Sequence, residues 1–174
     1  MSGVYSGSYN SALTLSAAIT NVTISGTVDA LGTTGSIKFG YTVSAAAFGP
    51  PDGSFTVEDS GLLTSPTFSL FDFGILLEAP GRVDNSGTII ESNGIGIYGT
   101  TGYVTNSGLI SLPTLGAGIY LAGAGTVLNA GTISAGNGNG VYMSHAGGTL
   151  VGFVNNAASG TISGNVGVFL PTPC

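Results

Sequence analysis

Glu58 and Asp84 are the residues best placed for acid–base or metal chemistry, because they occupy the same position in two copies of a repeated phrase, 57–61 (VEDSG) and 83–87 (VDNSG). If each copy belongs to one turn of a stacked coil, the two carboxylates lie one strand spacing apart, roughly 5 Å. Such a pair can hold a cation or share a proton. Glycosidases also use two carboxyl groups, about 5–10 Å apart. Two solvated charges at a corner of the coil are the alternative interpretation.

Other groups needed for catalysis are scarce in this chain. The two basic residues, Lys38 and Arg82, fall in different repeats, and His145 stands alone in a Ser-His-Ala-Gly turn. A lyase of the pectate type needs a base and a Ca²⁺ site. The stretch 136–140 (GNGNG) lacks the acidic ligands of calcium-binding repeats. We therefore predict no enzyme activity, with no catalytic residues, no metal site and no cofactor.

One turn position of the repeated phrase carries a carboxyl or carboxamide group in every copy: Asp59, Asn85, Asn106, Asn129 and Asn156. Stacked side-chain amides hydrogen-bond along a coil axis and tie successive turns together. Asparagine also tolerates the left-handed backbone conformation that a tight corner demands. We therefore predict a structural ladder at this position rather than a ligand site.

A second motif, glycine–aliphatic–aromatic, recurs with its glycines at 96, 118 and 140, a spacing of 22 residues, and a later copy ends at Phe169. The aliphatic and aromatic residues are neighbours and must face opposite sides of a strand. If the aliphatic residues face inward, the aromatic residues form an exposed column suited to binding a sugar or a protein partner. The alternatives are the reverse orientation and partial cover at a corner. The aromatic residues concerned are Tyr98, Tyr120, Tyr142 and Phe169.

Together the two motifs describe three short strands joined by turns within about 22 residues, and a fixed period of this length is typical of a solenoid. Helical repeats are disfavoured because 31 glycines are spread through the chain. The leucine-rich repeat pattern is also missing. The sequence predicts an all-β fold, a single-stranded parallel β-helix (β-solenoid) of about six or seven rungs, a rung being one turn of the coil. Strand twist favours right-handed winding, and alternation places Ile89, Ile110, Ile133 and Ile162 inside.

We expect a single solenoid domain over residues 1–174. Residues 1–55 form irregular N-terminal rungs or a cap, 56–170 form the regular rungs, and 171–174 form a proline-rich tail. Cys174 is the one cysteine, so no intramolecular disulfide can form. Its terminal thiol is a candidate for cross-linking two chains, and chance placement is the alternative.

Composition excludes several classes of function. With two basic and eight acidic residues the net charge is −6, which disfavours binding to nucleic acid. Mean hydropathy is +0.47, yet no apolar run reaches the 18 residues of a membrane-spanning helix. The first residues, MSGVY, show neither a basic segment nor an apolar segment of a classical signal peptide. Export would therefore need a removed leader, a C-terminal signal or a larger parent chain.

The phrases VDNSGTI, VTNSGLI and VLNAGTI, followed by GIGIY, GAGIY and GNGVY, resemble the repeats of autotransporter passenger domains and related bacterial surface adhesins. The resemblance covers about residues 55–170 and implies a right-handed parallel β-helix displayed outside the cell. The chain departs from that family in carrying no translocator barrel at its C-terminus. The resemblance implies an extracellular or bacterial cell-surface location, either for a fragment of a longer protein or for a stand-alone secreted protein.

The leading functional hypothesis is a structural solenoid that self-assembles through its two open ends into a filament or an adhesive surface layer. The alternative is a monomeric adhesin fragment that binds glycans or a host surface through the aromatic column. Ice binding is a further alternative, because Thr88, Thr132 and Thr161 share one repeat position. Leu109 interrupts that column and no second threonine column accompanies it, which disfavours ice binding.

Overall fold

The chain forms a β-solenoid built from three parallel sheets. The computed structural model describes residues 2–10, 13–15, 21–29, 37–39, 55–64, 73–144 and 152–170. Within these residues each rung supplies one strand to each sheet, and each sheet contains seven strands. The predicted all-β coil is therefore confirmed, with a rung count inside the expected range. No helix long and apolar enough to cross a membrane occurs in the described part of the chain.

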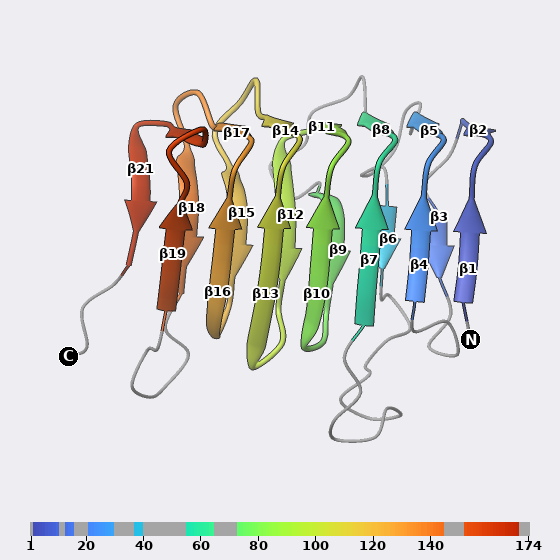
Figure 1. Ribbon diagram of the computed structural model, residues 1–174, viewed down its shortest axis with the longest axis horizontal. Coiled ribbons are helices and arrows are strands. Elements are labelled where there is room, and N and C mark those ends of the chain that lie inside the picture. Colours follow the sequence, from blue (N-terminus) through green and yellow to red (C-terminus); the bar gives the residue numbers. More distant parts are fainter. Residues whose placement is uncertain are drawn as a thin grey trace.

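Sheets A and C lie on opposite sides of the coil, and the short strands of sheet B close it along one edge (Figure 1). Sheet A consists of β1 (Ser2–Tyr5), β4 (Asn21–Ile24), β7 (Phe55–Asp59), β10 (Gly81–Asn85), β13 (Thr101–Asn106), β16 (Ala124–Asn129) and β19 (Gly152–Asn156). Sheet B consists of β2 (Ser8–Tyr9), β5 (Thr27–Asp29), β8 (Leu62–Thr64), β11 (Thr88–Ile90), β14 (Leu109–Ser111), β17 (Thr132–Ser134) and β20 (Thr161–Ser163). Sheet C consists of β3 (Leu13–Leu15), β6 (Ile37–Phe39), β9 (Phe73–Leu77), β12 (Asn93–Ile97), β15 (Ala117–Leu121), β18 (Asn139–Met143) and β21 (Val166–Phe169).

The interior is a set of aliphatic ladders. In β11, β14 and β17 a central isoleucine is fully buried between two partly exposed neighbours, as the alternation of a strand requires. Because these strands pair in register, Ile89, Ile110 and Ile133 stack directly on one another. Sheets A and C contribute similar columns of valine and isoleucine. Repetition of the same residue types therefore produces a core that is continuous along the coil, although each side chain contacts only the rungs next to its own.

The N-terminal rungs follow the same plan where they are described. β1 pairs with β4 and β4 pairs with β7 in continuous register, so sheet A begins at the second residue of the chain. Tyr5 and Tyr9 occupy core-facing positions of the first rung and pack against the aliphatic core. The expected proline-rich tail (171–174), His145 and Cys174 lie outside the described residues.

A column of glycines forms the turn between sheets A and B. A Cβ atom placed on Gly108 would overlap the carbonyl oxygen of Gly87 in the preceding rung, and Gly87 stands in the same relation to Gly61. That carbonyl oxygen of Gly87 accepts a hydrogen bond from the amide of Leu109 at 2.9 Å, so the turns cannot move apart without losing it. Glycine is thus required here by the close approach of stacked backbones.

We predict that Gly108→Ala lowers the free energy of unfolding by about 2 kcal/mol, because overpacking in a rigid site forces the backbone to shift. Gly7→Ala is the matched control. Gly7 holds the equivalent turn position of the first rung, where a Cβ atom meets the Tyr9 ring at an ordinary 3.7 Å. Urea unfolding of both variants measures the difference, and equal costs at the two positions would contradict the stacked-turn explanation.

Candidate functional site

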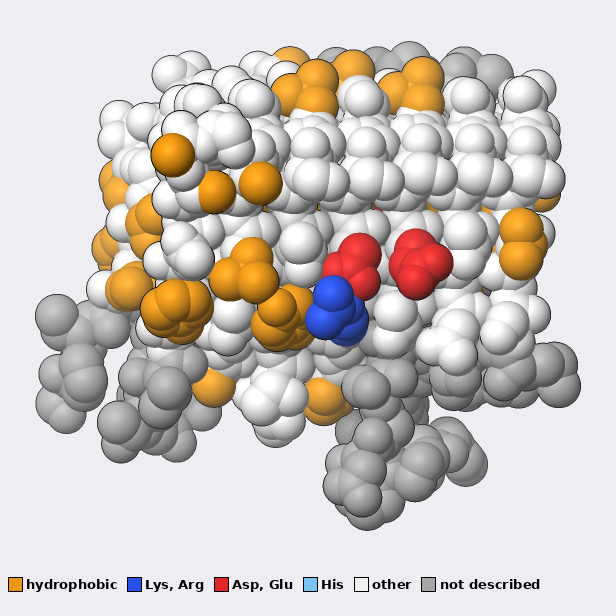
Figure 2. Space-filling view, in the orientation of Figure 1, with side chains coloured by type: hydrophobic (Ala, Val, Ile, Leu, Met, Phe, Trp, Pro, Cys, Tyr) orange, Lys and Arg blue, Asp and Glu red, His pale blue; other side chains and the backbone are white. Residues whose placement is uncertain are grey.

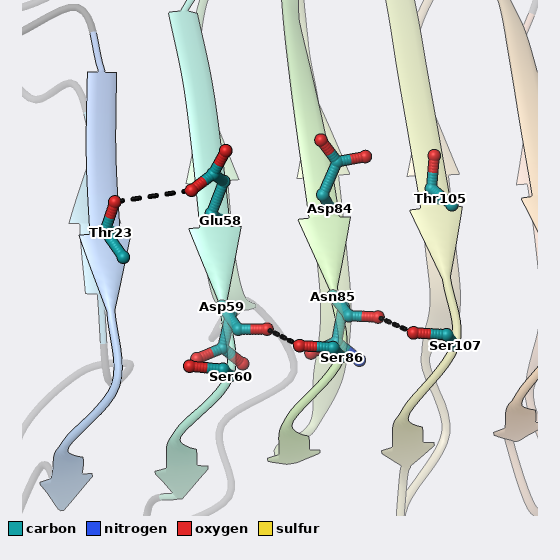
Figure 3. Close-up of a pocket in the computed structure, with 9 residues that line it drawn as sticks. All are labelled: Thr23, Glu58, Asp59, Ser60, Asp84, Asn85, Ser86, Thr105 and Ser107. Atoms are coloured by element: carbon teal, nitrogen blue, oxygen red, sulfur yellow. Dashed lines mark hydrogen bonds between the residues drawn. The ribbon is translucent and has the colours of Figure 1, made fainter.

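The carboxylates of Glu58 and Asp84 lie side by side on the outer face of sheet A, as the repeat predicts, but they have different partners. Their strands pair in register, with Thr23 before them and Thr105 after them (Figure 3). The Thr23 hydroxyl donates to Glu58 Oε2 at 3.4 Å. Arg82 Nε donates to Asp84 Oδ2 at 2.6 Å.

Of these two carboxylates, that of Asp84 forms a surface ion pair with Arg82. The hydrogen bond to Asp84 raises the pKa of the Arg82 guanidinium above its ordinary value. Side chains of Arg82 and Asp84 are 45% and 30% exposed, and exposed pairs of this kind contribute little stability. Among the described residues no cluster of three or more His, Cys, Asp or Glu side chains is arranged to hold a metal ion.

The predicted polar column is present as an asparagine ladder, formed by Asn85, Asn106, Asn129 and Asn156. Each side-chain Nδ2 donates to the Oδ1 of the next rung: Asn85 to Asn106 at 2.7 Å, Asn106 to Asn129 at 2.8 Å, and Asn129 to Asn156 at 2.7 Å. The first three residues are 2% exposed or less. The ladder is therefore a buried chain of hydrogen bonds parallel to the coil axis, which links one rung to the next.

Asp59 occupies the ladder position of the preceding rung but leaves it incomplete. Its Oδ1 accepts a hydrogen bond from Gly61 N at 3.0 Å, just as Asn85 Oδ1 accepts from Gly87 N at 3.2 Å. Its Oδ2 takes the place of the amide nitrogen, and this oxygen is buried without a hydrogen-bond partner. Burial raises the pKa of the Asp59 carboxyl to about 6, although the hydrogen bond from Gly61 opposes that shift.

The aromatic residues face outward from sheet C and form an aromatic stack, defined as Tyr98, Tyr120, Tyr142 and Phe169. Ring centroids of Tyr120 and Tyr142 are 5.4 Å apart with planes 6° from parallel, and those of Tyr142 and Phe169 are 5.1 Å apart at 5°. The neighbouring aliphatic residues face inward; Ile119 and Val141, for example, are fully buried. Partial burial raises the pKa of Tyr98, and the proximity of Tyr120 and Glu78 adds to that rise.

The repeat alignment at the start of this stack differs from the sequence prediction. Tyr120 pairs in register with Gly96, two residues before Tyr98, whereas Tyr142 and Phe169 follow Tyr120 directly. Gly94, not Gly96, is the equivalent of Gly118, because a Cβ atom on either would overlap a core isoleucine of sheet B, whereas Gly96 lies against the ring of Phe73. Tyr98 then bends back so that its ring lies 5.0 Å from that of Tyr120.

Stacking determines what the aromatic stack can bind. The ring of Tyr142 has a neighbouring ring over each of its two faces, so only its edges and its phenolic hydroxyl are left for a ligand. A sugar stacks on the face of an aromatic ring rather than on its edge. The two ends of the aromatic stack are the exposed ones: Phe169, which stacks on Tyr142 alone among the described rings, is 39% exposed, and Tyr98 is 48% exposed.

The two ends of the coil differ in character. The last rung leaves Val168 39% exposed at a position that is fully buried in the rungs before it. Val154 and Ile162 also occupy core positions in this rung and are half-buried. At the other end Tyr5 and Tyr9 contact each other edge to face, with centroids 5.9 Å apart, and pack against the aliphatic core.

A groove on sheet A was missed in the sequence. Arg82, Tyr103, Thr126 and Phe153 line it, and they occupy one repeat position on β10, β13, β16 and β19. Their position in the sequence could have identified them, because each one immediately precedes the core valine of its copy of the repeated phrase. Different residue types at this position concealed the column.

Comparison with known proteins finds no match to this chain among protein-family models, curated proteins or solved structures.

Proposed function

We propose that this protein is a structural β-solenoid that self-assembles head to tail into a filament or adhesive surface layer. The observation that carries the proposal is the last described rung, β19–β21, whose core-position side chains are half-exposed and whose strands pair on one side only. A strand edge of this kind recruits a further strand when nothing blocks it.

Parallel strands make the two ends complementary rather than alike. Every pairing in the three sheets is parallel, so the edge of β19 can accept β1 of a second copy in the same orientation in which β16 accepts β19. Continuing the register places Ser8 of the second copy against Thr161 and Tyr9 against Ile162. Such contacts between unlike surfaces do not close on themselves and propagate as fibres.

The charge distribution supports the same proposal. All ten Asp, Glu, Lys and Arg residues lie between positions 29 and 91, so the sequences of both end rungs carry none of them. Proteins that remain monomeric commonly place charges on exposed strand edges to prevent such pairing. The scarcity of charge, together with the resemblance of the repeats to surface proteins, supports an extracellular or cell-surface location for this proposal.

Electron microscopy of the purified chain is the direct test, because assembly predicts long fibres of constant width. Discrete rods about 34 Å long, the span of seven rungs at ~4.8 Å, at every concentration would contradict the proposal. A disulfide test then examines the register. In a Cys174→Ser background, Ser8→Cys combined with Thr161→Cys is expected to give a series of covalent oligomers on a non-reducing gel.

The geometry makes this disulfide specific for contacts between copies. Within one chain positions 8 and 161 belong to the first and the last rung, about 29 Å apart, far beyond the Cα separation of a disulfide. Ser8→Cys combined with Thr88→Cys is the control, since Thr88 is covered by strands on both sides and should give no oligomers. Fibres without the Ser8–Thr161 cross-link would show assembly by another contact.

A further inference from the structure

We propose that the outer face of sheet A carries a binding slot for a neutral pyranose sugar, held between the rings of Tyr103 and Phe153. The proposal is independent of self-assembly, because the slot lies on the side of the coil. Tyr103, Thr126 and Phe153 occupy successive rungs at one register position, so the small Thr126 separates two aromatic residues. Figure 2 shows hydrophobic side chains on this face beside the blue basic side chain and the red acidic ones.

The contact with Arg82 sets the orientation of the Tyr103 ring. The Arg82 guanidinium carbon lies 4.6 Å from the Tyr103 ring centroid, over its face, and Arg82 belongs to the preceding rung. The normal of the ring therefore points along the coil axis. Its other face is directed towards Phe153, across the threonine, and Phe153 itself is 55% exposed. This free ring face distinguishes the slot from the aromatic stack on sheet C.

The width of the slot selects the ligand. The strand positions of Tyr103 and Phe153 are two rung spacings apart, about 9.6 Å, so a ligand ring midway between side chains set at this spacing lies about 4.8 Å from each wall. Carbon atoms in contact sit about 3.5–4.0 Å apart, so a flat aromatic ligand touches only one wall. A pyranose chair carries axial C–H bonds on both faces, which makes it thicker than an aromatic ring. This extra thickness roughly fills the gap between that distance of about 4.8 Å and the contact distance, so a pyranose contacts both walls.

Polar groups around the slot match the edge of a sugar. The hydroxyl-bearing Thr126 forms its floor, and Thr101 and Arg82 also line it. Because Asp84 already pairs with the guanidinium and the chain carries a net charge of −6, an anionic ligand gains little here. A neutral sugar, apolar on its faces and hydroxylated at its rim, is the ligand whose chemistry fits.

Binding is tested by NMR titration of the full chain with a panel of methyl glycosides of neutral hexoses, and with a nucleoside as the planar competitor. We expect a methyl glycoside to bind and the nucleoside to bind at least tenfold more weakly. Tyr103→Ala and Phe153→Ala are each expected to weaken the sugar by tenfold or more. Absence of binding by every sugar tested, or preference for the nucleoside, would overturn the proposal.

Thr126→Phe provides a test that does not depend on destabilising the fold. The introduced ring fills the slot and continues the aromatic column, so sugar binding should disappear while the unfolding midpoint stays the same or rises. Thr132→Phe, on sheet B of the same rung, adds the same side chain away from the slot and should leave binding unchanged. Binding that survives Thr126→Phe would place the sugar elsewhere.

Discussion

Asn106→Ala is expected to lower the free energy of unfolding by about 4 kcal/mol. Asn106 is fully buried, accepts a hydrogen bond from Asn85 and donates one to Asn129. Removing its side chain breaks both bonds. The Nδ2 donor of Asn85 and the Oδ1 acceptor of Asn129 are then buried without their hydrogen-bond partner. An unsatisfied buried polar group costs about 1–3 kcal/mol, and two such groups account for the expected total. Chemical denaturation followed by circular dichroism measures the loss.

Asn156→Ala is the matched control at the open end of the same ladder. Asn156 is exposed, and its partner Asn129 keeps further bonds to the carbonyl oxygens of Gly131 and Thr161. Truncation also removes the bond that Asn156 donates to the carbonyl oxygen of Gly160 at 2.8 Å, so the expected loss at this exposed site is about 2 kcal/mol, the net value of two hydrogen bonds. Similar losses at both positions would mean that the ladder does not act as a continuous buried chain.

Asp59→Asn is expected to stabilise the protein by about 3 kcal/mol above pH 6. Asparagine supplies the amide nitrogen that every later rung has, and this nitrogen can donate to Asn85 Oδ1 as Asn85 donates to Asn106. In the native sequence the pKa of Asp59 rises from 3.8 to about 6. Each pKa unit corresponds to about 1.4 kcal/mol, so keeping the carboxylate ionised in the fold costs roughly 3 kcal/mol.

The gain in stability from Asp59→Asn should depend on pH, and the raised pKa of Asp59 fixes the direction of that dependence. A carboxyl group with a raised pKa binds its proton more tightly in the folded state, so its contribution is fully favourable below about pH 3.8 and is lost as the pH rises through about 6. The stability gained by Asp59→Asn should therefore grow across that interval and then remain constant. Glu58→Gln, on the outer face of the same strand, is the control. An Asp59→Asn gain that does not vary with pH would contradict this explanation.

Much of the fold was predictable because a parallel coil in register places each residue above its equivalent. Repetition alone then indicates which side chains meet: the isoleucines at 89, 110 and 133 form one core column, and the asparagines at 85, 106 and 129 form another. The alternation of strands supplies the remaining information, since it separates inward from outward positions without knowledge of the neighbours.

The missing hydrogen bond at Asp59 shows where that logic stops. The sequence places a carboxyl group in a column of carboxamides, and the two have nearly the same shape. Only the structure shows that the second oxygen is buried without a partner, because that depends on the rungs on both sides: Ile24 precedes Asp59 and offers no polar side chain, and Asn85 follows it.

The aromatic residues mark the division between sequence and tertiary structure most clearly. Period and composition determined that Tyr98, Tyr120, Tyr142 and Phe169 belong to one face, but the alignment by motif placed Tyr98 two residues away from its true register. The tight contact of Gly94 and Gly118 with core isoleucines matches the register that the chain adopts, and ring stacking decides which ring faces remain free. The slot between Tyr103 and Phe153 likewise depends on a gap at Thr126. A repeat pattern specifies what recurs, whereas a binding surface arises where the recurrence is broken, and only the folded chain shows what fills the break.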